Sequence, residues 1–131
     1  MKTRALLLLT GDPEFESIAQ VSADSAGYDL LIGRNPEDGA RLFARNLDGI
    51  DAVVVDLDIC EHGSAWLGAL TSLSRKLPAL AVSRLQQRFL QPLAQRHGAE
   101  HWLSKPISSD QLTAALEALC PAAQKTDARQ I

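Results

Sequence analysis

The chain has 131 residues, of which 46% are hydrophobic and 22% charged, and its formal net charge is -3. These values fit one folded domain with a buried core and argue against a disordered chain. No basic block occurs, which argues against direct nucleic-acid binding. Two cysteines without a CxxC spacing favour free thiols in a reducing compartment, and no apolar run is long enough for a signal peptide or a membrane span. We therefore expect a cytoplasmic protein that does not enter the membrane.

Short apolar runs alternate with helical patterns five times along the chain. The first two helices each begin with a capping residue and a proline, Asp12-Pro13 and Asn35-Pro36. The fourth helix is expected to begin near Leu90, because Pro92 would then fall in its first turn. The expected strands are residues 5–9, 28–32, 52–55, 79–82 and 100–103.

The last helix has the clearest start. Ser108 and Gln111 have the spacing of a capping box, and Ile107 can pack onto Leu112. The polar residues 121–131 are expected to be a frayed tail, so the predicted domain covers residues 1–120. Alternating strands and helices with right-handed crossovers predict an α/β fold, a (βα)5 three-layer sandwich with a parallel sheet.

Three polar residues close three of the apolar runs. Asp56 follows Ala-Val-Val-Val, Ser83 follows Ala-Leu-Ala-Val, and Lys105 follows Trp-Leu-Ser and precedes Pro106. The carboxyl ends of parallel strands meet at one edge of a sheet, so these side chains should lie close together. A carboxylate can accept a phosphoryl group, and a hydroxyl and an ammonium can bind its oxygens. The pattern predicts phosphoryl chemistry on Asp56.

The same pieces give the chain a resemblance to a known family. Val-Val-Val-Asp-Leu around Asp56, Ser83, Gly98-Ala99, Ser104-Lys105-Pro106 and Asp12-Pro-Glu-Phe resemble the receiver domain of bacterial two-component response regulators. The resemblance covers residues 4–120. It implies a flavodoxin-like sheet with strand order 2-1-3-4-5, and a cis bond before Pro106.

The resemblance also implies residue roles. Asp56 would be the phosphoacceptor, with phosphohistidine on a sensor histidine kinase or phosphotransfer protein as donor. Lys105 would pair with the phosphoryl oxygens, while Ser83 would bind the group and move with it. Trp102 matches the family's switch aromatic. The face made by helix four, strand five and helix five would bind a partner or a second copy.

At the end of the first strand, two positions depart from the family pattern; after Asp56 a further departure is Cys60, where the family usually has proline. Typical receivers end strand one in two acidic residues that organise Mg²⁺, whereas this chain has Thr10 and Gly11. Asp56 and Asp58 remain as weak candidate ligands for Mg²⁺, and Asp12 is a further possible ligand although it is needed as a helix cap. Any Mg²⁺ site is therefore expected to be weakened.

Two functions from different classes remain open. The first is a receiver that catalyses its own phosphorylation and dephosphorylation at Asp56 and acts by protein contact. The second is a pseudo-receiver, an interaction module that works without phosphorylation. Thr10 and Gly11 favour the second, whereas the joint presence of Asp56, Ser83 and Lys105 favours the first. Neither function includes turnover of an independent substrate.

Overall fold

A computed structural model describes residues 4–46, 48–58 and 63–119, and from residue 67 onward it also describes the side chains of the third helix. Its centre is a five-stranded parallel sheet with strand order β2-β1-β3-β4-β5, which confirms the predicted topology. The strands are β1 (Arg4–Leu9), β2 (Tyr28–Gly33), β3 (Ala52–Asp56), β4 (Ala79–Ser83) and β5 (His101–Ser104). The expected tail at 121–131 lies outside the described residues.

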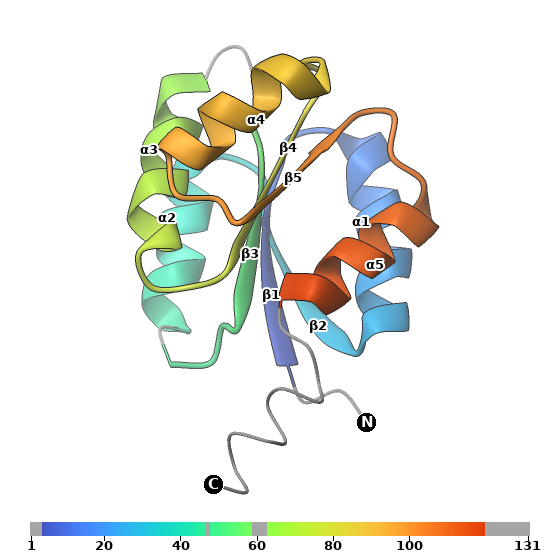
Figure 1. The fold of residues 1–131 in the computed structure, drawn as a ribbon. Coiled ribbons are helices and arrows are strands. Elements are labelled where there is room, and N and C mark those ends of the chain that lie inside the picture. The colour runs from blue at the N-terminus through green and yellow to red at the C-terminus, as the bar shows by residue number, and fades with distance from the viewer. Residues whose placement is uncertain (1–3, 47, 59–62, 120–131) are drawn as a thin grey trace, which may run out of the picture.

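Helices cover both faces of the sheet. Figure 1 shows α1 (Pro13–Ala26) and α5 (Ser109–Leu119) together on one face, with α2 (Pro36–Arg45), α3 (Gly63–Ser74) and α4 (Gln87–Arg96) on the other. This is the expected three-layer arrangement. No helix in the described part of the chain is long and apolar enough to cross a membrane.

Alternation along the strands divides the core into two clusters. Leu6 and Leu8 of β1 pack with α1 and α5, whereas Leu7 and Leu9 pack toward α2, α3 and α4. All four leucines are at most 1% exposed. Successive strand residues point to opposite faces, so a strand covered on both faces must be apolar throughout. This explains the unbroken leucine run.

Three helix starts follow the predicted local signals. The side chains of Asp12 and Asn35 accept hydrogen bonds from the backbone N–H groups of Glu14 and Asp38. Before α5, the backbone N–H of Ser108 donates to the Gln111 side chain, and the Gln111 N–H donates to the Ser108 hydroxyl. These bonds satisfy N–H groups that have no partner within the helix.

The predicted start of the fourth helix was wrong. α4 begins at Gln87, three residues before Leu90, and Pro92 lies inside the helix. Leu90 and Ala94 are fully buried, while Pro92 is exposed. A proline inside a helix leaves one backbone carbonyl without its N–H partner, and on the exposed face water can bind that carbonyl. Burial of Leu90 and Ala94 therefore holds this helix together across the proline.

Candidate functional site

The site lies where four strands end at the same edge of the sheet. Asp56 is the last residue of β3 and Ser83 the last of β4, while Thr10 and Lys105 directly follow β1 and β5. Asp56 is fully buried, Thr10 is also fully buried, and Ser83 is 2% exposed. The three residues predicted from the strand ends therefore share one polar site, although they do not all contact one another.

Three donors surround the Asp56 carboxylate. The Thr10 hydroxyl donates to Oδ2 at 2.5 Å, and the Lys105 ammonium donates to the same oxygen at 2.9 Å. The backbone N–H of Asp58 donates to Oδ1 at 3.0 Å. These donors satisfy a buried charge that would otherwise be costly.

The Lys105 ammonium lies among three carboxylates. Its Nζ is 2.9 Å from Asp56 Oδ2, 3.1 Å from Asp12 Oδ2 and 3.2 Å from Asp58 Oδ2. Burial alone would lower the pKa of Lys105, but the hydrogen bond to Asp56 and its charge, together with the bonds to Asp12 and Asp58, raise it above its ordinary value. The Lys105-Pro106 peptide bond is cis, as predicted.

Asp12 links the site to the start of α1. Its Oδ1 accepts from the backbone N–H of Glu14 as the helix cap, while its Oδ2 binds Lys105. Burial would raise the pKa of Asp12, but the hydrogen bond and charge of Lys105 hold that pKa below its ordinary value. The sequence analysis anticipated the capping role, and the structure adds the ion pair.

Ser83 binds Asp58 in this structure. The Ser83 hydroxyl donates to Asp58 Oδ1 at 2.7 Å, and the same oxygen accepts from the backbone N–H of Arg84 at 2.8 Å. The backbone N–H of Leu85 donates to the Ser83 hydroxyl at 3.1 Å. Asp58 therefore bridges the end of β3 and the loop after β4.

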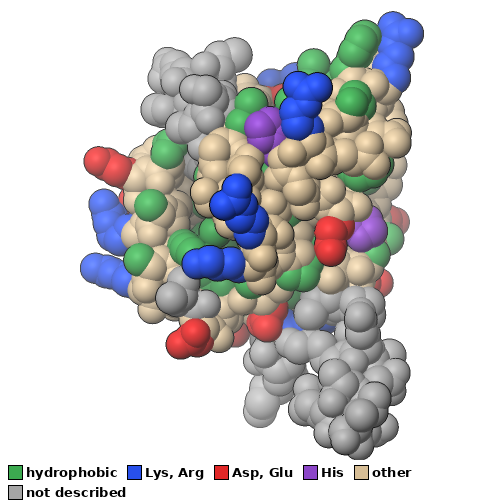
Figure 2. Space-filling view, turned by 60° about the vertical axis from the view of Figure 1, so that its left-hand side comes forward, with side chains coloured by type: hydrophobic (Ala, Val, Ile, Leu, Met, Phe, Trp, Pro, Cys, Tyr) green, Lys and Arg blue, Asp and Glu red, His purple; other side chains and the backbone are tan. Residues whose placement is uncertain are grey.

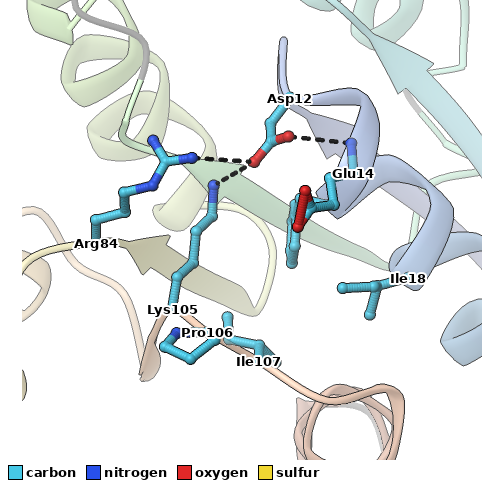
Figure 3. A pocket seen from close by; sticks show the side chains of 8 residues that line it. Asp12, Glu14, Ile18, Arg84, Lys105, Pro106 and Ile107 are labelled. Atoms are coloured by element: carbon cyan, nitrogen blue, oxygen red, sulfur yellow. Dashed lines mark hydrogen bonds and ion pairs between the residues drawn. The ribbon is translucent and has the colours of Figure 1, made fainter.

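A cavity of about 400 Å³ opens beside these charges. Figure 3 shows Arg84 and Lys105, which follow the neighbouring strands β4 and β5, both pointing toward Asp12. The rest of the lining is largely apolar and comes from the start of α1 and the segment before α5, namely Phe15, Ile18, Pro106 and Ile107, with Glu14 at its edge. The cavity therefore joins the two cations and the Asp12 carboxylate to an apolar wall.

Trp102 packs away from the carboxylates of the site. It lies on β5 opposite Ala81 of β4, is half-buried, and packs against the core cluster on the side of α2, α3 and α4. This environment is compatible with ordinary packing, and its predicted switching role stays a prediction.

The oxygen atoms around Asp56 are not arranged as ligands of a Mg²⁺ ion in the described part of the chain. Mg²⁺ needs oxygen ligands at about 2.0–2.1 Å in near-octahedral geometry. Here the oxygens of Asp12, Asp56 and Asp58 converge on the Lys105 ammonium, and the Thr10 hydroxyl is engaged with Asp56. Among the described residues, no group of three or more acidic, histidine or cysteine side chains is arranged to hold a metal ion. The weak site predicted from Asp56, Asp58 and Asp12 is therefore occupied by a protein cation.

Sequence analysis missed two residues of this site. The sequence pattern marks Thr10 only as the position of a missing acid and does not point to Arg84. Both directly follow strands at the edge where Asp56 and Ser83 lie, so the rule of converging strand ends could have found them.

Comparison with solved structures identifies the fold. A receiver domain from Clostridium thermocellum is 18% identical with a TM-score of 0.75, and covers 94% of this chain and 98% of its own. This chain has the receiver-domain fold. A signal receiver domain from Vibrio parahaemolyticus is 17% identical with a TM-score of 0.77, over 100% of this chain and 99% of its own.

A third structure with the receiver fold is a CheX–CheY complex with BeF3 and Mg²⁺ from Borrelia burgdorferi. It is 14% identical with a TM-score of 0.76, and covers 88% of this chain and 87% of that one. No family model matches the sequence, and no curated protein matches it either.

Proposed function

We propose that this chain is a signalling receiver that accepts a phosphoryl group on Asp56 from a sensor histidine kinase or phosphotransfer protein. The observation that carries the proposal is the 2.9 Å contact between the Lys105 ammonium and the buried Asp56 carboxylate at the edge of the sheet. A carboxylate is a possible nucleophile, and the adjacent cation can bind the oxygens of the transferred group. The receiver fold supports the same assignment.

The proposed reaction is a displacement at phosphorus. A carboxylate oxygen of Asp56 forms the new P–O bond while the P–N bond of the donor's phosphohistidine breaks. The imidazole nitrogen leaves with the electron pair of that bond and takes up a proton. The Lys105 ammonium and the Asp58 N–H lie where they can stabilise charge on the phosphoryl oxygens.

Intact-mass spectrometry after treatment with acetyl phosphate tests this proposal. We expect a mass increase of one phosphoryl group in the wild type and its loss in Asp56→Asn. Asp38→Asn is a matched control, because Asp38 is a surface acid on α2 that pairs with Arg41 away from the site. A modification that survives Asp56→Asn would show that the acceptor is another residue.

Ser83 and Trp102 would report the phosphorylated state. A phosphoryl group on Asp56 offers new acceptor oxygens to the Ser83 hydroxyl, which donates to Asp58 in this structure. Movement of Ser83 would change the packing of β5, where Trp102 lies. We expect phosphorylation to change the tryptophan fluorescence of the wild type, with a smaller change in Ser83→Ala.

The α4–β5–α5 face is the proposed contact surface for a partner or a second copy. The side of the molecule that carries α2, α3 and α4 has Lys and Arg side chains among apolar ones (Figure 2). On α4 and the loop before it, Leu85 is 42% and Phe89 53% exposed, and Arg88 and Arg96 are exposed beside them. α4 contains no acidic residue. The α4 part of this face fits an acidic and partly apolar partner, while α5 contributes the exposed acids Asp110 and Glu117 to its other side.

Charge reversal tests this surface. Arg88→Glu with Arg96→Glu should weaken self-association in analytical ultracentrifugation, or binding to a partner kinase in a pull-down. Val21→Asp on α1 is the control, since Val21 is an exposed apolar residue on the other side of the sheet. If only the α1 substitution abolishes binding, the contact surface lies elsewhere.

A phosphorylation-independent module is the second candidate. The observation that favours it is the Thr10 hydroxyl bond to Asp56, at the strand end where receivers usually have an acidic residue. If the chain is such a module, no phosphodonor should increase its mass. Partner binding should then be unchanged in Asp56→Asn.

A further inference from the structure

Two protein cations contact the carboxylates of the site. Asp12, Asp56 and Asp58 bring three negative charges to the strand ends, and Lys105 contacts all three. Arg84 makes longer ion pairs with two of them. Lys105 and Arg84 together therefore supply the two positive charges that a divalent metal ion would bring.

The backbone fixes the position of Arg84. It directly follows Ser83, and its N–H donates to Asp58 Oδ1 at 2.8 Å. Its guanidinium reaches over the site, with Nη2 at 3.9 Å from Asp12 Oδ2 and Nη1 at 4.0 Å from Asp58 Oδ2. Figure 3 shows the Arg84 and Lys105 side chains meeting at Asp12.

The guanidinium of Arg84 keeps donors available for a ligand. The side chain is 72% exposed and lines the cavity beside the site, so its present ion pairs are long and screened by solvent. A guanidinium presents a planar set of N–H donors that can bind two phosphoryl oxygens at once. A phosphoryl group on Asp56 carries nearly two negative charges where the carboxylate carried one, and this larger charge draws a nearby guanidinium more strongly than the present carboxylates do.

We infer that Lys105 and Arg84 take the place of Mg²⁺ in this chain, and that Arg84 binds the phosphoryl group as it is transferred to Asp56. The inference rests on the proposed function. Lys105 offsets the charge of the three carboxylates and binds the phosphoryl oxygens next to Asp56, and Arg84 closes over those oxygens from the solvent side. Phosphorylation of Asp56 consequently does not depend on a divalent metal ion.

The first experiment follows phosphorylation by acetyl phosphate with intact-mass spectrometry, once in EDTA and once with Mg²⁺. We expect equal rates for the wild type in the two buffers. In EDTA, phosphorylation of Arg84→Ala should be slower than that of the wild type by about tenfold or more. Arg84→Lys should have an intermediate rate, because lysine keeps the charge but lacks the planar set of N–H donors. Arg41→Ala is the matched control, since Arg41 is also an exposed arginine paired with an aspartate, on α2.

The second experiment measures metal binding without phosphorylation. Calorimetric titration with MgCl2 should show no binding to the wild type. The double variant Lys105→Met/Arg84→Ala, which leaves the three carboxylates without their cations, should gain Mg²⁺ affinity. Circular dichroism of each variant checks that the fold is kept.

The outcomes separate the two proposals. If phosphorylation requires Mg²⁺, or Arg84→Ala matches Arg41→Ala, the inference is overturned while the proposed function stands. If no phosphorylation occurs in either buffer, the proposed function fails, and with it the role of Arg84 toward the phosphoryl group. In that case the titration still tests whether Lys105 and Arg84 replace the metal ion, because Mg²⁺ binding by the wild type would show that they do not.

Discussion

Replacing Thr10 by valine should destabilise the fold measurably. The Thr10 hydroxyl donates to Asp56 Oδ2 at 2.5 Å and accepts from the backbone N–H of Asp12 at 3.0 Å, and its side chain is fully buried. Valine has nearly the same shape, so the substitution removes these hydrogen bonds without opening a cavity. The Asp56 carboxylate and the Asp12 N–H each lose one partner.

The size of the expected loss of stability follows from the charge of the Asp56 carboxylate that accepts the bond. A hydrogen bond to a charged group contributes about 1.5–3 kcal/mol, and Asp56 Oδ2 keeps its bond to Lys105. We therefore expect the free energy of unfolding of Thr10→Val to fall by about 2 kcal/mol. With a urea dependence of about 1–3 kcal/mol/M, the midpoint of urea unfolding should fall by about 1 M.

The assay is urea unfolding followed by circular dichroism at pH 7. Thr10→Ser keeps the hydroxyl and loses one methyl group, so it should cost only about 1 kcal/mol. Thr10→Val should also cost less in an Asp56→Asn background, because a neutral amide oxygen is a weaker acceptor than a carboxylate. The reasoning is refuted if Thr10→Val is as stable as Thr10→Ser.

Three further predictions concern the metal, the pH dependence and a helix end. Adding Gly11→Asp to the Lys105→Met/Arg84→Ala variant should tighten Mg²⁺ binding in a calorimetric titration, because it adds a carboxylate after β1 where the two cations no longer contact the acids, and an unchanged titration would contradict our description of the site. The pKa of Lys105 is raised by folding, so its contribution to stability is present below its ordinary pKa of 10.5 and is lost as the pH rises through the higher folded value. Folding lowers the pKa of Asp12, so its contribution to stability is present above its ordinary pKa of 3.8 and is lost as the pH falls through the lower folded value. In thermal unfolding, Lys105→Met should lack the loss of stability at alkaline pH, and Asp12→Asn should lack the loss at acid pH. Gly27→Ala should cost about 1–2 kcal/mol in urea unfolding, because Gly27 ends α1 with φ 81°; a variant as stable as the wild type would count against this reading.

Local signals account for the parts of the fold that sequence analysis predicted well. The caps at Asp12, Asn35 and Ser108 act within a few residues, and the apolar strands form a pattern that the chain shows directly. The start of α4 was missed because Gln86 at its N-cap makes no side-chain capping bond with the described residues. Burial of Leu90 decides that helix, and burial depends on the whole fold.

In the site, too, some features follow from local sequence signals and others depend on the whole fold. Strand ends predicted that Asp56, Ser83 and Lys105 would come together, because parallel strands end at a common edge. The partner of each side chain could not be predicted, since Ser83 binds Asp58 and Thr10 binds Asp56 across segments distant in the sequence. Such pairings depend on side-chain positions of a few ångströms, which a strand pattern does not define.

The division of the core into two clusters has a consequence for how such a chain can evolve. Leu6 and Leu8 belong to one cluster and Leu7 and Leu9 to the other, with the sheet backbone between them. A substitution in one cluster can thus be compensated among its own neighbours while the other cluster keeps its packing. The two sides of the sheet can drift in sequence at separate rates. The α4 part of the proposed contact face can accordingly be remodelled for a new partner without rebuilding the core beneath α1 and α5.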